Sequence, residues 1–322
     1  MKAVFGSSIG KQGRERGLSL GIAFAVMVAL FAIGPIVVYP VFLMKALCFS
    51  LFACAFNLLI GYVGLASFGH ALFFGWASYV TAYSAKAWGF SPELAIIAGT
   101  ATAAVLGVVA GGLAIRRQGI YFAMITLALS QMMYFFALEA KFTGGEDGIQ
   151  GVPRGRLFGV FDLSNEMTMY AFVVIIVLAG FLLIYRIINS PFGEVLKAIR
   201  ENEQRTISLG YATDRYKLVA FVLSATLSGL AGSLKALVFQ LASLTDVHWT
   251  MSGDVLLMTL LGGLGTVFGP VVGAFVVVAM QNYLAPFGQW VLVIQGAIFV
   301  VCVLAFRRGI VGELAKALRL PL

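Results

Sequence analysis

Charged side chains are scarce in this sequence, and their scarcity decides the class of protein. Asp, Glu, Lys and Arg together make up 11% of the 322 residues, whereas 61% of the residues are hydrophobic. In a typical soluble protein about a quarter of the residues are charged. A water-soluble core could not bury so many apolar side chains. The composition therefore excludes an ordinary soluble enzyme and predicts an integral membrane protein.

Cysteine is also rare. Cys48, Cys54 and Cys302 all fall inside apolar segments. Their spacing fits neither a disulfide framework nor a set of metal ligands. We interpret them as small apolar packing residues, and we expect neither a metal site nor a cofactor.

Ionisable residues are few within the apolar segments, and His70, Lys235 and Asp254 stand out. Such residues are candidates for a functional role, because burying a charge in a membrane is unfavourable. Each also has a structural interpretation. His70 fits a neutral imidazole bonded to a carbonyl, Lys235 a side chain that extends to the membrane surface, and Asp254 a helix N-cap. No chain of carboxylates crosses these segments, which argues against an ion-coupled carrier and against an ion channel.

A nucleotide-binding motif is missing too. Residues 6–12 ("GSSIGKQ") differ from a phosphate loop in three ways. Three residues rather than four separate the glycines, Gln12 stands where Ser or Thr would bind magnesium, and no strand precedes the motif. We therefore expect no ATPase or other enzymatic site in this chain. Energy for its function has to come from a separate protein.

Long apolar runs are what the sequence does contain. A helix needs about 20 apolar residues to cross the hydrocarbon layer. The predicted fold class is an all-α, polytopic integral membrane protein with about nine or ten spanning or re-entrant helices, some of them half-helices broken at glycines. The predicted segments lie near 18–39, 43–61, 64–85, 94–115, 119–138, 168–188, 217–239, 254–284 and 289–306.

The distribution of charge predicts the orientation. Basic residues concentrate in residues 1–17 and in the loop 189–216, whereas the loop 139–167 carries more acidic than basic residues. Basic loops are retained on the cytoplasmic side of a membrane. We expect a cytoplasmic N-terminal segment, a single membrane domain over 18–306 with the loop 139–167 outside, and a cytoplasmic tail over 307–322.

The segment 254–284 is too long for one regular crossing. Residues 260–270 ("LLGGLGTVFGP") place four glycines and a proline in its middle. Such residues weaken a helix, and irregular backbone at membrane depth requires protein or water to satisfy it. We predict a half-helix from Asp254, a turn over 262–269 and a returning helix to about Tyr283. This hairpin, re-entrant or crossing twice, keeps the basic tail inside; a single kinked helix with an outer tail is the alternative.

A second glycine-rich stretch matches the first. Residues 61–75 ("GYVGLASFGHALFFG") and 262–275 ("GGLGTVFGPVVGAF") share Gly-x-x-Gly followed by Phe-Gly. Paired glycine-interrupted segments in the two halves of a transporter indicate a pathway between discontinuous helices. Close packing of helices is the alternative explanation.

Residues 190–217 ("SPFGEVLKAIRENEQRTISLGYATDRYK") collect many of the charges. Ser190 and Pro191 are typical of a helix start, and Gly210 of a stop. The mixed charges do not favour binding to an anionic lipid surface. We predict a short amphipathic helix, a turn and a second arm, which form either a solvated connector or a docking site for a cytoplasmic partner. Apolar residues at roughly helical spacing are Val195, Leu196, Ile199 and Ile207.

Five motifs, in order, resemble those of the LivM-type permease subunit of branched-chain amino-acid ABC importers. The resemblance extends from about residue 45 to 310. It implies an all-helical fold of the ribose- or vitamin-importer permease kind. The motifs are "GYVGLASFGHALFFGWASY", "RQGIYFAMITLALSQM", "TGGEDGIQGVP", "SPFGEVLKAIRENEQRTISLGYATDRYKLVAFVLSATLSGLAG" and "LLMTLLGGLGTVFGPVVGAF".

The resemblance implies a function and a set of partners. The chain would be a multi-pass subunit of the bacterial inner (plasma) membrane that moves branched-chain or related hydrophobic amino acids into the cytoplasm. Its partners would be a homologous LivH-type permease, two cytoplasmic ABC ATPase subunits, a periplasmic substrate-binding protein and the lipid bilayer, but no nucleic acid. Urea, short amides or aromatic compounds are alternative cargoes. An ion-coupled secondary carrier and a scaffold without transport are remote alternatives.

The resemblance also implies roles for individual residues. This chain departs from the family in residues 239–254 ("FQLASLTDVHWTMSGD"), where relatives often have a proline. The resemblance therefore implies no contacts for Asp246 and His248. Contacts to the ATPase are expected from Glu194, Arg200, Glu201, Asn202, Arg205 and Gly210. Docking of the binding protein is expected at Gly144, Gly145, Asp147, Gly148 and Gly151. The expected translocation path is lined by Asn57, Gly64, Ser67, Gly69, His70, Thr126, Gln131, Asp254, Gly262, Gly263 and Gly265.

Overall fold

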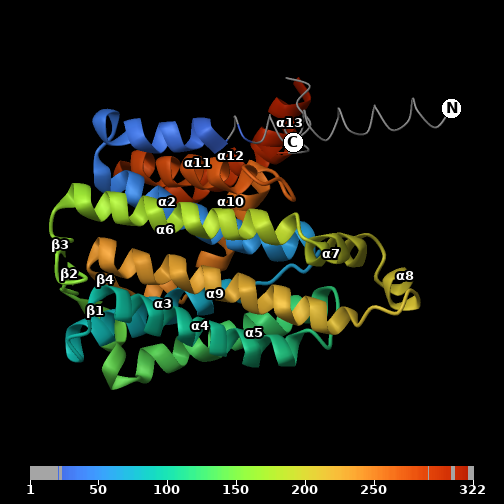
Figure 1. Cartoon of the computed structure of the whole chain (residues 1–322), viewed down its shortest axis with the longest axis horizontal. Helices are drawn as coiled ribbons and strands as arrows, with labels where there is room; N and C mark the ends of the chain where they lie inside the picture. Colours follow the sequence, from blue (N-terminus) through green and yellow to red (C-terminus); the bar gives the residue numbers. More distant parts are fainter. Residues whose placement is uncertain (1–20, 22–23, 289, 306–308, 318–322) are drawn as a thin grey trace.

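The computed structural model describes residues 21, 24–288, 290–305 and 309–317. This part of the chain is a bundle of α-helices that run side by side, with short strands at one end (Figure 1). The phosphate-loop-like motif and the predicted N-terminal segment lie outside the described residues. Of the predicted tail, α13 (Gly309–Ala317) is described.

The long helices form where the sequence is apolar over 19 or more residues. Within the described ranges, six helices are long and apolar enough to cross a membrane. The predicted count of nine or ten spanning or re-entrant helices is not confirmed. The six are α2 (Pro40–Tyr62), α4 (Pro92–Ala114), α5 (Ile120–Glu139), α6 (Glu166–Ile188), α9 (Thr213–Phe239), and Gly269–Phe287, which consists of α11 (Gly269–Leu284) and the 3-10 turn η4 (Ala285–Phe287).

Shorter or less apolar helices run alongside these six. At a rise of 1.5 Å per residue, a helix of 14 residues such as α10 is about 21 Å long. This is shorter than the hydrocarbon layer, which is about 30 Å thick. The shorter helices are Phe24–Val37, α3 (His70–Ala87), α10 (Trp249–Gly262) and α12 (Trp290–Ala305).

The two ends of the bundle carry different elements (Figure 1). The short helices α7 (Pro191–Glu201) and α8 (Glu203–Ser208) lie at one end, which we call the α7 end, and α13 lies toward it. The opposite end, the strand end, carries two antiparallel pairs, β1 with β4 and β2 with β3. Elements at the strand end are β1 (Ile149–Gln150), β2 (Arg156–Leu157), β3 (Phe161–Asp162), β4 (Leu241–Ala242), and the 3-10 turns η1 (Lys141–Thr143), η2 (Gly145–Asp147) and η3 (Leu244–Asp246).

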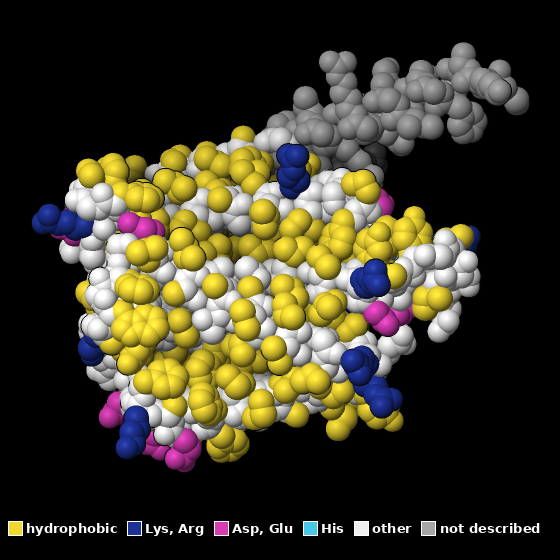
Figure 2. All heavy atoms as spheres, turned by 60° about the horizontal axis from the view of Figure 1, so that its bottom comes forward, with side chains coloured by type: hydrophobic (Ala, Val, Ile, Leu, Met, Phe, Trp, Pro, Cys, Tyr) yellow, Lys and Arg dark blue, Asp and Glu magenta, His cyan; other side chains and the backbone are white. Residues whose placement is uncertain are grey.

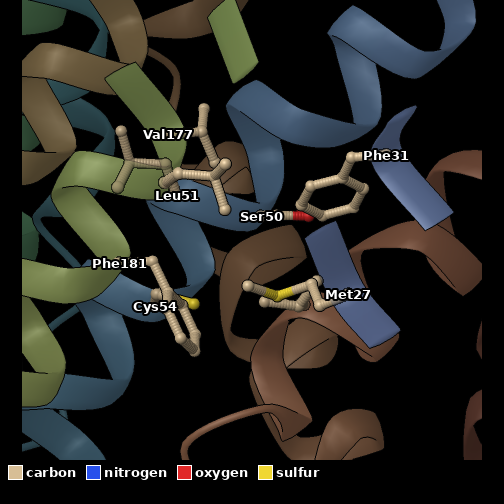
Figure 3. A pocket seen from close by; sticks show the side chains of 9 residues that line it. Met27, Phe31, Ser50, Leu51, Cys54, Val177 and Phe181 are labelled. Atoms are coloured by element: carbon tan, nitrogen blue, oxygen red, sulfur yellow. The ribbon is translucent and has the colours of Figure 1, made fainter. Parts of the chain in front are cut away.

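The core is built around α2 and α9. α9 packs against α2, α3 and α4, and most of α2 is buried. Small residues allow this close approach: a Cβ added to Gly107 of α4 would lie 2.8 Å from Cβ of Ala225 in α9. Beside α2, a gap lined by Met27, Ser50 and Val177 has a volume of about 10 Å³ (Figure 3). That is the lower limit for one water molecule, so this region of the core has no room for a cargo molecule.

The flanks of the bundle are apolar, and the charges lie mostly toward its ends. Figure 2 shows one flank covered with hydrophobic side chains, with Lys, Arg, Asp and Glu gathered mainly at the two ends. Large apolar side chains are exposed on α4, α5, α6 and α12; Ile120 of α5, for example, is 70% exposed. Lipid tails or a neighbouring membrane helix can cover such surfaces, whereas water would not favour them.

The predicted segment 64–85 was wrong at its start. Residues 64–69 are not helical, and α3 begins at His70. The physical reason is local, since Gly64 has a φ of +83° and ends the continuation of α2. The other predicted segments that lie fully in the described residues agree with helices to within a few residues.

The predicted break within 254–284 is present. α10 and α11 are separate helices that pack closely against each other. A Cβ on Gly273 would lie only 2.8 Å from the backbone nitrogen of Gly262. The alternative of one kinked helix is therefore wrong. The start was also misplaced: α10 begins at Trp249, where the His248 side chain accepts a hydrogen bond from the Thr250 backbone. Asp254 is thus not an N-cap.

Candidate functional site

The first glycine break, residues 63–69, connects α2 to α3 and is held by side-chain hydroxyl groups. Thr126 Oγ1 on α5 accepts a hydrogen bond from the Phe68 N–H at 3.2 Å, and Ser67 Oγ accepts one from the Gly69 N–H at 3.2 Å. A Cβ on Gly69 would lie 2.6 Å from the Thr126 carbonyl oxygen. Only glycine therefore allows α5 to approach this turn so closely.

A third hydroxyl completes the start of α3. Ser252 Oγ on α10 accepts a hydrogen bond from the Ala71 N–H at 2.9 Å, and Ser252 is fully buried. The first N–H groups of a helix have no partner within the helix, so this bond satisfies one of them in the buried interior. The sequence interpretation missed Ser252, which stands in an apolar helix without a recognisable motif.

The second glycine break, residues 263–268, connects α10 to α11 and is held by Asn57 of α2. Asn57 Nδ2 donates to the Thr266 carbonyl at 2.9 Å, and Asn57 Oδ1 accepts from the Gly265 N–H at 3.0 Å. One amide side chain thus pairs both a donor and an acceptor of the irregular backbone. Within the break, Thr266 Oγ1 donates to the Gly263 carbonyl at 2.8 Å.

The end of α2, directly before the first break, meets the second break at the α7 end. A Cβ on Gly61, at the end of α2, would lie 2.8 Å from the Gly265 nitrogen, so the two backbones are in contact. Arg200 of α7 donates through Nη1 to the Gly61 carbonyl. A Cβ on Gly64 would lie 3.2 Å from Cγ of the same arginine. Arg200, predicted as an ATPase contact, therefore also touches both glycine-rich stretches.

An open hollow lies next to this junction. Its volume is about 530 Å³, and polar groups of α7 face it. It brings together predicted coupling residues and one predicted path residue. The lining consists of Tyr62, Lys197, Arg200, Glu201 and Gly265.

His70 lies in an aromatic enclosure at the start of α3. It is fully buried, and its Nε2 lies 2.9 Å from Ser224 Oγ of α9, which in turn donates to the Ala55 carbonyl of α2 at 2.6 Å. The expected carbonyl partner is thus replaced by a hydroxyl group. A role in contacting cargo stays a prediction. Rings of Phe56, Phe73 and Phe221 surround the imidazole edge to face.

The remaining predicted path residues are dispersed. Asp254 is half-buried on α10 and accepts a hydrogen bond from Gln281 Nε2 of α11 at 3.3 Å. It therefore ties the two arms of the second hairpin together. Gln131 is half-buried on α5. In the described residues, no group of three or more His, Cys, Asp or Glu side chains could hold a metal ion.

The segment 190–210 forms the predicted amphipathic element. Ser190 Oγ accepts a hydrogen bond from the Gly193 N–H at 3.4 Å, and Pro191 occupies the first turn of α7. Leu196 and Ile199 are buried, as predicted. Ile207 is 46% exposed and does not continue the apolar stripe of α7, because it lies on a separate helix, α8.

The predicted coupling residues share an exposed surface. Asn202 lies between the two short helices, and its Oδ1 accepts from the Arg205 N–H at 3.0 Å to cap α8. Gly210 has a φ of +90° where the element ends, as its predicted stop requires. The exposed residues of this surface are Glu194, Arg200, Glu201, Asn202, Arg205 and Gly210.

An ion pair that the sequence interpretation missed joins this element to α9. Lys217 Nζ, which is buried, pairs with Glu203 Oε1 of α8. Thr213 Oγ1 donates to the same carboxylate oxygen at 3.3 Å. Glu203 and Lys217 are 14 residues apart along the chain. Their contact depends on how α8 folds back, which no spacing rule indicates.

At the strand end, the predicted docking glycines form a series of turns. Gly144, Gly145, Gly148 and Gly151 all have φ between +60° and +79°, as their predicted role in turns requires. Asp147 is exposed among them. Docking of a binding protein at this surface stays a prediction.

A short hairpin of β2 and β3 lies farther along the same loop. The Asp162 carboxylate in β3 accepts a hydrogen bond from the Ser164 N–H at 2.8 Å. Hydrogen bonds from the backbone and side chain of Ser164 lower the pKa of this carboxyl below its usual range.

Lys235 does not extend to the membrane surface. It is buried, and its Nζ lies 2.6 Å from Oδ2 of Asp246, which is also buried. The interpretation of Lys235 as a surface-seeking side chain is therefore wrong, because a carboxylate from the next turn reaches back to it. His248 caps α10, and its ring packs against Tyr134 of α5 with centroids 5.1 Å apart.

Together these features define a multi-pass membrane transport protein with two helix–break–helix hairpins in contact. Residues 38–303 match the family model of the branched-chain amino acid transport system permease component, and the chain belongs to this family. It is a family of transport permease components of ABC transporters. The resemblance to LivM-type permeases is thereby confirmed.

Curated relatives agree with this assignment. The permease protein LivM of the high-affinity branched-chain amino acid transport system of Escherichia coli is 25% identical over 82% of this chain and 68% of its own length. A probable LivM of Methanocaldococcus jannaschii is 29% identical over 56% of this chain and 53% of its own length. The ribose import permease protein RbsC of Bacillus subtilis is 28% identical over 56% of this chain and 58% of its own length. No solved structure gives a significant match.

Proposed function

We propose that this chain is the permease subunit of an ATP-driven importer that moves branched-chain or related hydrophobic amino acids into the cytoplasm. Separate ATPase subunits would bind α7 and α8, a homologous LivH-type permease would complete the membrane part, and a soluble binding protein would deliver cargo. The names of the LivM relatives support this cargo class. The N-terminus and the α7 end would face the cytoplasm of a bacterial inner membrane, in keeping with their basic loops.

The observation that carries the proposal is the position of Arg200. It lies on the helix proposed to bind the ATPase, and it donates to Gly61 beside the junction of the two breaks. A displacement of α7 would therefore act on the last turn of α2 and on the irregular backbone at Gly64 and Gly265, which the same arginine contacts. Such backbone is more easily rearranged than a regular helix, because few of its hydrogen bonds belong to a repeating ladder.

The proposed cycle uses this connection. Closure of the ATPases on ATP binding would move α7, and Arg200 would pull on the backbone at Gly61 and change its contact with Gly265. Interfaces of packed helices switch between discrete arrangements, so a small displacement can open or close a path. Asn57, Ser67 and Thr126 would supply polar groups along that path. Weak contacts suffice there, since tight binding would slow release.

The test is uptake by the complete complex in proteoliposomes. Glu201→Lys reverses the charge of an exposed residue on the proposed ATPase surface, and we expect at least a tenfold loss of ATP-dependent leucine uptake with normal membrane insertion. Arg116→Glu, an exposed charge reversal in the turn between α4 and α5, outside α7, α8 and the predicted docking loop, is the matched control. Normal uptake by Glu201→Lys would reject the ATPase surface. Uptake without ATP would indicate a secondary carrier instead, and competition by urea or aromatic compounds would revise the cargo.

A further inference from the structure

Two lysines mark the two ends of α9. Lys217 and Lys235 are 18 residues apart, which corresponds to five turns of an α-helix, so they lie on the same face about 27 Å from each other. No charged residue lies between them in the sequence. Both lysines are buried, and each pairs with an acidic residue from a segment outside α9.

The pair at the α7 end holds the coupling element. Glu203 is the first residue of α8, and its carboxylate binds Lys217 and accepts from Thr213. Asp214 adds a second carboxylate oxygen 3.8 Å from Lys217 Nζ. The Lys217 side chain is 2% exposed, so this charge depends on its partners for stabilisation. The first turn of α9 and the start of α8 therefore move as one unit.

The pair at the strand end holds the segment after α9. Asp246 Oδ2 binds Lys235 at 2.6 Å and accepts from the Ser243 N–H at 3.2 Å, which fixes η3 against α9. β4, just before it, pairs with β1 in the glycine-rich outer loop. A Cβ on Gly148 would lie 3.2 Å from the Ser243 Cα atom, so that loop rests directly on the fixed segment.

The outer loop is tied to the end of α9 by further bonds. Arg154 Nη2 donates to the Val238 carbonyl at 2.8 Å, and the Val152 N–H donates to the Gln240 carbonyl at 3.1 Å. Between the two ends, Ser224 joins α9 to α2 and to His70. The helix is thus one continuous rigid element with a fixed attachment at each end.

We propose that α9 is the strut that carries the docking signal of the binding protein from the strand end to the ATPase surface, with Lys235–Asp246 and Lys217–Glu203 as its two joints. This inference rests on the proposed function and assigns it positioning residues. Replacing a buried ion pair with neutral groups of similar size is often neutral for stability, so stability alone does not require two such pairs. Their positions, one at each end of α9 and each to a carboxylate from a neighbouring segment, suit a mechanical link.

The experiment compares ATP hydrolysis by the reconstituted complex with and without cargo-loaded binding protein. Lys235→Met combined with Asp246→Asn removes both charges and keeps the volume. We expect the ratio of stimulated to unstimulated hydrolysis to fall at least fivefold, while the unstimulated rate stays within twofold of the parent. Lys217→Met combined with Glu203→Gln should lower the ratio as well. Thr226→Val on the same helix, whose hydroxyl bonds only the Val222 carbonyl of α9, is the control and should keep the parent ratio.

A parent-like ratio in the neutral pair variant would overturn the proposal. If that variant does not assemble, a second experiment tests the proposal. A spin label is attached to Ile207→Cys on α8 in a complex that is otherwise unchanged. Its signal should change when binding protein is added, and an unchanged signal would equally overturn the strut. Failure of the proposed function is distinguishable, because the parent complex itself would then show no ATP-dependent uptake.

Discussion

The two glycine breaks match in sequence and in topology, but they are held in different ways. The first, residues 63–69, is held by the hydroxyl groups of its own Ser67 and of Thr126 on α5, which are both buried, and Ser252 holds the start of α3 directly after it. The second, residues 263–268, is held from outside by the amide of Asn57 and from within by its own Thr266 hydroxyl, and it borders an open hollow at the α7 end.

This difference indicates a division of labour. A break held by several groups in a close-packed region resists displacement, because any movement leaves several backbone groups without partners. A break that only one side chain from another helix holds, beside an open hollow, can change its conformation at lower cost. We therefore expect the first break to act as a fixed turn and the second as the moving part. The predictions below test this contrast, in order of decreasing effect on folding.

Gly69→Ala should have the largest effect. The added Cβ meets the Thr126 carbonyl oxygen at 2.6 Å, and backbone of α5 cannot move away without disturbing its own packing. We expect a loss of about 3 kcal/mol in the free energy of unfolding. Thermal denaturation in detergent measures it. Gly253→Ala, where the added Cβ meets nothing within 4 Å, should be harmless, and an equal loss in both variants would refute the explanation.

Asn57→Leu should come next. It removes both bonds of the second break and leaves the Gly265 N–H and the Thr266 carbonyl without protein partners. We expect a loss of about 2 kcal/mol. Asn57→Asp keeps the acceptor for Gly265 but buries a carboxylate against the Thr266 carbonyl oxygen, so it should not restore the lost stability. A melting temperature unchanged by Asn57→Leu would show that the amide does not hold the break.

Ser252→Ala should lower the free energy of unfolding by less, about 1 kcal/mol. It removes one hydrogen bond to the start of α3, while Thr126 and Ser67 still hold the first break. Ser252→Thr keeps the hydroxyl and is the comparison variant. Hydrogen exchange of the Ala71 amide is the direct readout. Exchange that is no faster in Ser252→Ala than in Ser252→Thr would contradict the assigned bond.

Arg200→Lys should change folding least but transport most. The side chain is exposed, so we expect the free energy of unfolding to fall by less than about 0.5 kcal/mol. Lysine keeps the charge but lacks the planar fork that lets arginine direct a donor at the Gly61 carbonyl. Leucine uptake should fall about tenfold. Arg205→Lys, on the same surface but away from the breaks, is the control for replacing arginine with lysine. An equal loss of uptake in the two variants would show that Arg200 has no special role.

The sequence indicated the helical hairpins well, for physical reasons. Long apolar runs specify helices, and four glycines with a proline specify the break before α11. The helix start at Ser190 and Pro191 followed from capping rules. The family followed from motifs in order, and the family model agrees.

Contacts between distant residues were beyond the sequence. The bonds of Asn57 to the second break connect residues more than 200 positions apart, and no periodicity encodes them. The pairing of Lys235 with Asp246 was missed for another reason. The sequence left the contacts of Asp246 open, and only the fold shows that η3 returns to α9. The apolar spacing that holds for Leu196 and Ile199 does not extend to Ile207. A second helix begins between them, so the positions that face the core are no longer the ones that this spacing indicates.

The start of α13 rests on the second break: a Cβ on Gly309 would lie 2.5 Å from the Gly263 nitrogen. Ending the chain before residue 309 would uncover this backbone. Such a truncated protein should be more sensitive to protease between α10 and α11. An affinity tag is better fused beyond residue 317, so that the cover over Gly263 stays in place.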